Sequence, residues 1–463
     1  MIKSQAPSTW LHGFLFLGLC FVILLFLWLP GLRLPITSDT SVYMRLGASL
    51  WHTGSYVLDG APYAKHLPLH PLLSYPFVWL IGGQMGMKVS SLLAGMGVLA
   101  ATFFLLKRPF GTTVASLAIL FLALHHGFVL MTILGSADLL FTALFLGSLA
   151  AFQAADDRKK MYLLSGVFLG LACLTRYNGI LLFGLYPLFI LRKRPRDLKS
   201  AYLWGGACLA LGLFGLWLVR NAIVFGNPLF TSYTSEFQAQ TPSLLREVWR
   251  NFLYYLNPLH NILPVLLCFS LWGLWREGKR NALLVLGMMA GSAFALIWWV
   301  KGIRFAFPGY PILLGFATVA VLDLWQKRSR RMIFVFVAVL TLALHTGALC
   351  VYAYGQCNAW FDQTVGHIPS DLGLSSEGLF GISLARDYIN SEAPYGSTVL
   401  VDSVNYWTWQ SGVFRPDIRI VSSLKEQCPA FFIDQSVTSV GAALFQTKSA
   451  PITKVFLLQC PQS

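Results

Sequence analysis

Residues 11–32 read LHGFLFLGLCFVILLFLWLPGL, a run that contains no charged side chain. A transmembrane helix needs about 20 mostly apolar residues, so this run is long enough to cross a bilayer. It is also too long for the apolar core of a signal peptide, and no small-residue cleavage site follows it. We therefore expect a retained membrane anchor.

Uncharged apolar runs of this kind recur along the chain as far as residue 354. The chain is 56% hydrophobic, and its 11% of charged residues is well below the roughly 25% of an average soluble domain. The runs are too long and too uniformly apolar for barrel strands, so helices must satisfy the backbone within the lipid. We predict an all-α polytopic membrane protein with spans at about 11–32, 87–106, 113–134, 137–155, 161–175, 178–192, 201–225, 254–275, 281–299, 304–325 and 332–354.

The basic residues decide whether one doubtful segment, residues 68–84, also crosses. It is short, and it contains three prolines, which break or bend a helix. If it does not cross, all the basic loops share the cytoplasmic side with the N-terminus, as the positive-inside rule expects. These loops are residues 107–108, 158–160, 192–199, 276–280 and 327–331.

This topology has about eleven spans, and it accounts for the net charge of +15 without a nucleic-acid partner. It places three regions on the non-cytoplasmic side. They are the first outer loop at 33–86, a second loop at 226–253, and the tail from about residue 355.

The tail has ordinary polarity and charges of both signs. Residues 398–401 and 454–458 look like strands, and residues 379–390 look helical. We predict a small C-terminal α/β domain at 355–463, following a transmembrane domain at 1–354. In an oxidising compartment one pair of its cysteines could form a disulfide, and the sequence leaves the pairing open. These cysteines are Cys357, Cys428 and Cys460.

The first outer loop contains two candidates for chemistry. Asp39 follows the first span, and Lys65 precedes a proline-rich strip at a height suited to a lipid phosphate. Each has a structural alternative, because Asp is a favoured helix N-cap and Lys extends its amine to head groups. His66 and His70 are four residues apart, but nearby prolines argue against the helix that a shared metal site would need. We predict no metal and no cofactor.

Further polar residues are expected on the same side. Asp138 lies at a turn between two spans, where an acid needs a partner or can cap the next helix. Several cations oppose the positive-inside bias, and Arg is suited to bidentate contact with phosphate, although anionic head groups are an alternative. Together they predict a lipid-phosphate site. These cations are Arg176, Arg220, Lys301 and Arg304.

The order of these features resembles the GT-C superfamily of glycosyltransferases, and in particular the bacterial relatives of protein O-mannosyltransferases and the lipid A aminoarabinose transferase. An Asp follows the first span, then come an amphipathic helix, a loop Lys, and a second Asp after the next helical hairpin. One departure is His66-Leu67-Pro68 after Lys65, where relatives often have Pro-Pro. The matching stretches are residues 38–40 with Tyr43 and Leu50, 63–69, 138–140, 174–179, 217–221, 226–228, and 304–305 with Pro308 and Pro311.

The resemblance implies an inverting transfer of a hexose or pentose from a polyprenyl-phosphate carrier to an acceptor hydroxyl on the non-cytoplasmic face. It implies that Asp39 is the general base and Asp138 a second acid. The other site residues would bind substrate, with Lys65 and Arg304 at the carrier phosphate. The substrate-binding set is Lys65, Arg176, Tyr63, Arg220, Lys301 and Arg304.

The acceptor stays open between a lipid, a protein and a cell-envelope glycan. We expect a bacterial inner membrane protein, in contact with membrane lipids, with its C-terminal domain in the periplasm. The alternative function is a membrane transporter or lipid flippase, which would favour charged pairs near the bilayer centre and broken helices there. In this sequence most charges lie at the outer rim.

Overall fold

The structure is a computed structural model of the 463-residue chain. In the membrane part it describes residues 7–33, 38–58, 60–240, 243–256, 264–298 and 303–326. In the C-terminal part it describes residues 385–386, 388–400, 418–421, 430–434, 443–446 and 454–458.

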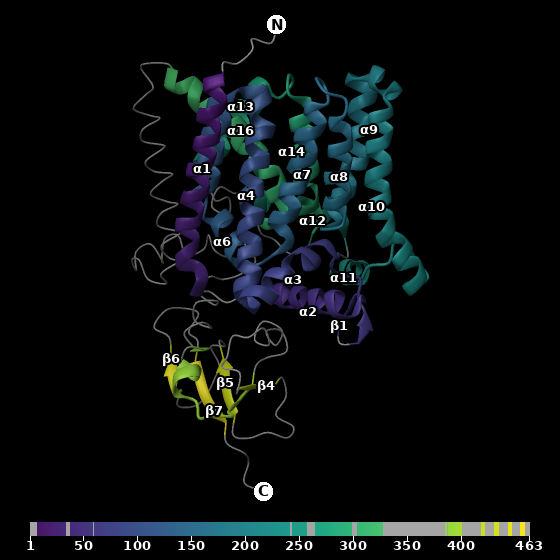
Figure 1. Cartoon of the computed structure of the whole chain (residues 1–463). Helices are drawn as coiled ribbons and strands as arrows, with labels where there is room; N and C mark the ends of the chain where they lie inside the picture. The colour runs from purple at the N-terminus through teal and green to yellow at the C-terminus, as the bar shows by residue number, and fades with distance from the viewer. Residues whose placement is uncertain are drawn as a thin grey trace.

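The membrane part is a bundle of helices (Figure 1). The longer elements are α1 (Pro7–Trp28), α2 (Ser38–Thr53), α3 (Leu69–Ile81), α4 (Gly83–Phe110), α5 (Thr112–Ala123), α6 (His126–Leu134), α7 (Ala137–Ala154), α8 (Met161–Cys173), α9 (Leu181–Lys193), α10 (Ala201–Phe225), α11 (Tyr233–Gln240), α12 (Leu244–Leu256), α13 (Pro264–Glu277), α14 (Ala282–Ile297) and α16 (Tyr310–Gln326). The short elements are η1 (Leu29–Arg33), β1 (Val57–Leu58), β2 (Ala61–Pro62), η2 (Tyr177–Ile180), η3 (Pro195–Lys199), α15 (Ile303–Ala306) and η4 (Phe307–Gly309).

The prediction of a multi-pass helical membrane protein is confirmed. Among the described residues, five helical segments are long and apolar enough to span a bilayer alone: α1, α4, α7, α10 and Arg304–Trp325. Helices α3, α8 and α14 are apolar but shorter. Each of the first ten predicted spans contains a helix, and the eleventh, residues 332–354, lies outside the described residues. The number of crossings stays a prediction.

The predicted single span at residues 113–134 is wrong as a continuous helix. Helices α5 and α6 meet at an angle of 63°. His125 lies at the break with an extended backbone, and its Nδ1 accepts a hydrogen bond from the N–H of Phe128 at 3.1 Å. This bond satisfies one of the N–H groups that the start of α6 leaves without an intrahelical partner. The side chain of His125 thus caps the start of α6.

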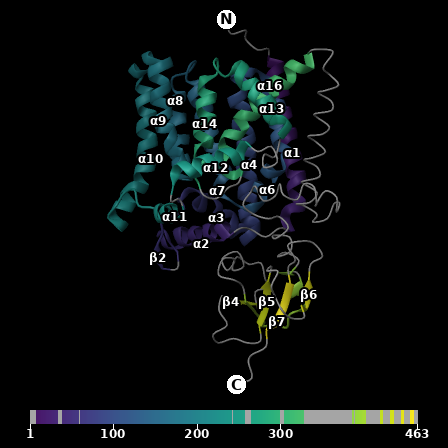
Figure 2. The ribbon, with the colours of Figure 1, turned by 180° about the vertical axis from the view of Figure 1, so that it is seen from behind.

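The proline-rich segment is helix α3, which lies with α2 across one end of the bundle (Figures 1 and 2). Pro71 falls in the first turn, where a missing N–H costs little. A Cβ on Gly47 of α2 would lie 2.8 Å from the carbonyl oxygen of Pro71, so the two helices pack backbone against backbone. We call this end of the bundle the α2 end.

The opposite end, which we call the basic end, carries the basic loops. Ion pairs join Arg108 to Asp157 at 2.8 Å and Lys159 to Asp197 at 2.6 Å. These pairs tie the end of α4 to the α7–α8 loop, and that loop to η3. The described basic loops lie at one end, as predicted, while residues 327–331 lie outside the described residues. The direction of the bundle across a membrane stays a prediction.

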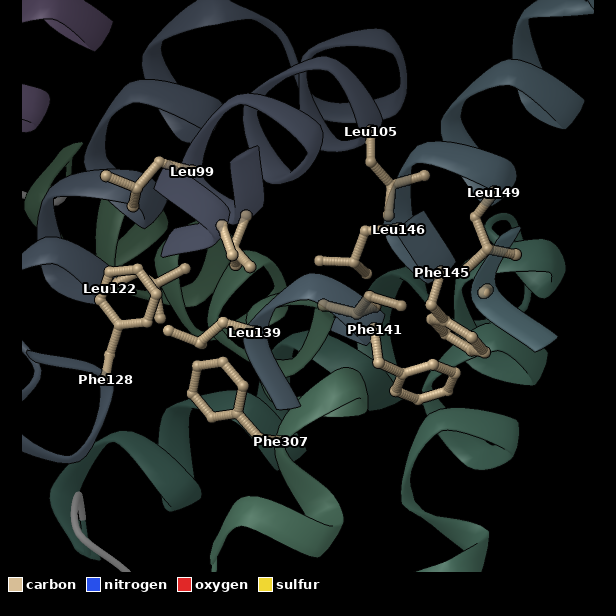
Figure 3. Close-up of a cluster of buried hydrophobic side chains, with 14 of the residues drawn as sticks. Leu99, Leu105, Leu122, Phe128, Leu139, Phe141, Phe145, Leu146, Leu149 and Phe307 are labelled. Atoms are coloured by element: carbon tan, nitrogen blue, oxygen red, sulfur yellow. The ribbon is translucent and has the colours of Figure 1, made fainter. Parts of the chain in front are cut away.

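The core of the bundle lies between α4, α5, α6 and α7, with η4 closing one side (Figure 3). Phe128 of α6 stacks on Phe307 of η4 with ring centroids 5.9 Å apart. Elsewhere small residues bring helices close, because a Cβ on Gly166 of α8 would lie 2.0 Å from the carbonyl oxygen of Gly206 in α10. Such contacts suit helices in lipid, where close packing rather than water exclusion drives association.

The described C-terminal residues form a five-stranded mixed sheet beyond the α2 end (Figure 1). The strand order is β4-β3-β5-β7-β6, with β3 parallel to β4 and β5, and β7 antiparallel to β5 and β6. The predicted strands are confirmed, and residues 388–392 are helical as expected. The three tail cysteines lie outside the described residues. The strands are β3 (Thr398–Leu400), β4 (Arg419–Val421), β5 (Ala430–Asp434), β6 (Phe445–Gln446) and β7 (Lys454–Leu458).

Candidate functional site

The turn between α6 and α7 fixes the start of α2, and with it Asp39. Thr40 Oγ1 donates a hydrogen bond to the carbonyl oxygen of Leu134 at 2.6 Å. Gly135 follows with φ of +73°, and a Cβ there would lie 2.5 Å from Thr40 Cγ2. The turn therefore needs glycine both for its left-handed backbone and for the close approach of α2. Asp39, in the first turn of α2, is held beside the bundle.

A cavity of about 220 Å³ lies at the α2 end. Its wall combines α2, the loop before α3, the turn after α8, α11, and the segment from α14 to α15. Segments far apart in the sequence thus meet around one space. The lining residues are Asp39, Tyr43, Lys65, His66, Leu67, Thr175, Arg176, Tyr177, Asn178, Tyr233, Glu236, Phe294, Trp298, Arg304 and Phe305.

The Asp39 carboxylate lies between two cationic or potentially cationic groups. Its Oδ1 is 3.8 Å from His66 Nε2, and its Oδ2 is 3.8 Å from Arg304 Nη1. Burial raises the pKa of Asp39, but His66, Arg304, Arg176 and Lys65 together bring that pKa below its usual value. The carboxylate is therefore ionised at neutral pH, and its side chain remains 39% exposed.

Arg176 is anchored from behind the cavity by Asp138. Arg176 Nη2 lies 2.8 Å from Asp138 Oδ1, and the Asp138 side chain is only 3% exposed. Asp138 is absent from the cavity wall, so in this structure it contacts the predicted cation rather than the cavity. A buried acid of this kind needs a counter-charge, and Arg176 supplies it.

Lys65 is paired with a residue that the sequence reasoning missed. Its Nζ lies 2.5 Å from Glu236 Oε1 of α11, and both side chains are partly exposed. The signal that could have found Glu236 is its place in the outer loop 226–253. The predicted topology put that loop on the same side as Lys65, and Lys65 needed a partner.

His66 was considered only as half of a metal pair, and the structure gives it other neighbours. Its side chain is buried, its Nδ1 lies 3.2 Å from the Tyr233 hydroxyl, and its Nε2 faces Asp39. Burial lowers the pKa of His66 to about 4, against the opposing effect of Asp39. His70 turns elsewhere, since its Nε2 donates to the carbonyl oxygen of Gly135 at 3.1 Å. Tyr43 contacts both rings, with centroids 4.8 Å apart in each case.

The remaining predicted residues lie outside the cavity wall or outside the described residues. Arg220 Nη2 donates to the carbonyl oxygen of Tyr56 at 3.0 Å, and its guanidinium lies over the Trp217 ring, so it holds the first outer loop. Tyr63 is not part of the cavity wall, but its ring packs against His66 in a tilted arrangement with ring centroids 5.8 Å apart. Lys301 lies outside the described residues. The cavity thus gathers Asp39, Lys65, Arg176 and Arg304 of the predicted set.

Comparison with known proteins agrees with this fold. Residues 65–219 match the family model described as dolichyl-phosphate-mannose-protein mannosyltransferase. No curated protein sequence matches the chain. The crystal structure of ArnT from Cupriavidus metallidurans bound to undecaprenyl phosphate is similar at a TM-score of 0.60 and 15% identity, covering 99% of this chain and 100% of that one.

Two further solved structures are similar. ArnT from the same organism in the apo state matches at a TM-score of 0.57 and 16% identity, over 93% of each chain. The oligosaccharyltransferase of Archaeoglobus fulgidus, in complex with zinc and sulfate, matches at a TM-score of 0.52 and 13% identity, over 86% of this chain and 62% of that one. The predicted resemblance is confirmed at the level of the fold, which this chain shares with these solved structures.

Proposed function

We propose that this protein transfers a sugar from a polyprenyl-phosphate carrier to a hydroxyl group of an envelope acceptor, with inversion at the anomeric carbon. The observation that carries the proposal is the cavity wall, where one ionised carboxylate, Asp39, stands among Lys65, Arg176 and Arg304. A sugar phosphate needs cations at its phosphate and a base near its anomeric carbon.

The cations of the cavity and the ligand of a similar solved structure support the choice of donor. Arg and Lys stabilise phosphate oxygens through charge-assisted hydrogen bonds. The Nε atoms of Arg176 and Arg304 are buried and have no hydrogen-bond partner among the described residues. The similar ArnT structure is bound to undecaprenyl phosphate. These observations support a polyprenyl-phosphate sugar with its phosphate at Arg304 and Lys65.

The reaction follows from the position of Asp39. The acceptor oxygen attacks the anomeric carbon and forms the new glycosidic bond, while the bond from that carbon to the phosphate oxygen breaks. The acceptor proton passes to Asp39, and the bonding electron pair leaves with the phosphate. Arg304 and Lys65 stabilise the charge that grows on the leaving oxygen. A phosphate leaves readily as an anion, so no separate general acid is needed.

The basic residues support an orientation of the bundle across the membrane. The basic end carries Arg108, Lys159 and Arg194, which the positive-inside rule assigns to the cytoplasm. The α2 end would then face the periplasm of a bacterial inner membrane, together with the C-terminal sheet. The acceptor would be an envelope lipid, protein or glycan that reaches this face.

Mass analysis of envelope glycolipids and glycoproteins tests the proposal. Cells that lack the protein should lose a sugar-bearing species, and wild-type protein should restore it. The Asp39→Asn variant should reach the membrane but leave the species missing, because the amide cannot take the proton. The matched control is Asp157→Asn at the basic end, which should restore the species. Full restoration by Asp39→Asn would contradict the proposal.

A further inference from the structure

We propose that His66 is a positioning residue for the base, holding an Nε2–H toward the Asp39 carboxylate while its Nδ1 accepts a hydrogen bond from the Tyr233 hydroxyl. This inference rests on the proposed function, and it goes further by assigning a role to a residue that departs from the pattern of the relatives. It stands on three contacts, each from a different part of the chain.

The first contact fixes the tautomer of the imidazole. A neutral histidine has one N–H and one acceptor nitrogen, and the partner of one nitrogen decides which atom carries the proton. His66 Nδ1 lies 3.2 Å from the Tyr233 hydroxyl. Burial raises the pKa of Tyr233, so this hydroxyl keeps its proton and can donate it to Nδ1. A hydroxyl can also accept, but the ionised Asp39 carboxylate beside Nε2 can only accept, so the N–H of His66 is at Nε2.

The second contact directs that N–H. His66 Nε2 lies 3.8 Å from Asp39 Oδ1, longer than a hydrogen bond, and such contacts commonly shorten when substrate binds. The imidazole has little freedom to turn away. Tyr43 packs against it with ring centroids 4.8 Å apart, and the Tyr56 hydroxyl donates to the His66 carbonyl oxygen at 3.0 Å.

The third contact, between Arg304 and the Asp39 carboxylate, explains why a neutral partner is useful. Arg304, on the other side of the carboxylate, is assigned to the donor phosphate, and so is Lys65. When the donor binds, these cations share their charge with the phosphate and stabilise Asp39 less. The ring nitrogens of His66 face Asp39 and Tyr233, so its hydrogen bond persists through the reaction and fixes which oxygen of Asp39 remains for the acceptor.

The ionisable neighbours of Asp39 come from every element that packs around it. They include the cations Lys65, Arg176 and Arg304, the tyrosines Tyr43, Tyr63 and Tyr233, and Glu236 of the same cavity wall. A His66 variant leaves all of these in place. A change in the pH profile of such a variant therefore reports the contact with His66.

The test compares His66→Leu, His66→Gln and His70→Leu in the full-length protein. For His66→Leu, kcat should fall by roughly 10- to 100-fold, the value expected for a hydrogen bond to a charged group, while the KM for the donor stays within about twofold. The loss of an N–H donor disfavours the charged form of Asp39 and raises its pKa. The acid limb of the pH profile of kcat, which reports the enzyme with substrate bound, should therefore move up by about one pH unit.

His66→Gln should recover most of kcat and return the acid limb, because its amide can place an N–H near the same point. His70→Leu is the matched control. This histidine is also buried, also packs against Tyr43 and has its pKa lowered to about 4, but it bonds to Gly135 rather than Asp39. It should lower thermal stability and leave the acid limb in place.

The outcomes separate this inference from the proposed function. If Asp39→Asn retains wild-type turnover, the proposed function fails. If Asp39→Asn is inactive but His66→Leu keeps the wild-type acid limb and kcat, only the role of His66 is overturned. If His66→Leu and His70→Leu move the acid limb equally, His66 acts through the fold and the inference is also overturned.

Discussion

The two ends of the bundle both carry ion pairs, but they use them differently. At the basic end, Arg108 meets Asp157 at 2.8 Å and Arg276 meets Asp323 at 2.5 Å, in pairs with one well-exposed member each. At the α2 end, Asp39 has two neighbours at 3.8 Å and lines a cavity. The pairs at the basic end are closed contacts at helix ends, whereas among the described residues the charged neighbours of Asp39 stay 3.8 Å away.

A cluster of charged side chains is therefore not enough to identify a ligand-binding site in a membrane protein. A closed pair at the rim adds little to stability. The α2 end instead holds several groups of opposite sign around one space, with guanidinium nitrogens that have no hydrogen-bond partner among the described residues.

The largest expected effect is on stability, at the one deeply buried pair of the α2 end. Arg176→Gln should lower the free energy of unfolding by about 3–5 kcal/mol, because Asp138 would be left buried without its counter-charge. Lys159→Gln, at the basic end, should cost much less, since Asp197 keeps its hydrogen bond from the Tyr162 hydroxyl at 2.5 Å. Denaturation of the purified variants in micelles measures both. Equal losses would erase the distinction between the ends.

The next effect is on catalysis and concerns Arg304. Arg304→Gln should lower kcat/KM by about 10²- to 10³-fold, because a donor to the leaving phosphate is lost. Its control is Arg276→Gln at the basic end, which should leave kcat/KM unchanged. Steady-state kinetics with a polyprenyl-phosphate sugar measures the contrast. An Arg304→Gln enzyme with normal kcat/KM would remove Arg304 from the site.

A smaller effect is expected at the turn that supports Asp39. Gly135→Ala should cost about 1–3 kcal/mol from its left-handed backbone, with a further loss from the clash with Thr40. It should also lower kcat, because the start of α2 must shift. Gly226→Ala is the control, with a similar φ of +68° and open space at its Cβ. A normal kcat in Gly135→Ala would show that this turn does not position Asp39.

The smallest effect is expected at Glu236, which is paired with Lys65. Glu236→Gln should lower the KM for the donor severalfold, by about 1 kcal/mol, because a carboxylate no longer competes with the donor phosphate for Lys65. The value of kcat should change little. Binding of polyprenyl phosphate measured directly gives the same comparison. Weaker binding in this variant would mean that Glu236 supports Lys65 rather than competing for it.

Much of the fold could be predicted from the sequence, because a membrane requires long apolar runs for its spans and favours basic residues in the loops on one side. The apolar runs and basic loops predicted the helical bundle, and Asp39, Lys65 and Arg304 were expected on one side of it. The break at His125 was not predicted, since an apolar run does not show where a helix bends. Glu236 was also missed as a partner of Lys65, because 171 residues separate them in the chain.

The central claim is that Asp39 and the two cations Lys65 and Arg304 act on one sugar–phosphate bond. The most direct measurement is a structure of the Asp39→Asn variant with an intact polyprenyl-phosphate sugar bound, since this variant should bind the donor without turning it over. The account predicts the donor phosphate within hydrogen-bond distance of Arg304 and Lys65, with residue 39 on the opposite side of the anomeric carbon. A phosphate bound outside this cavity, or residue 39 on the phosphate side of the sugar, would contradict it.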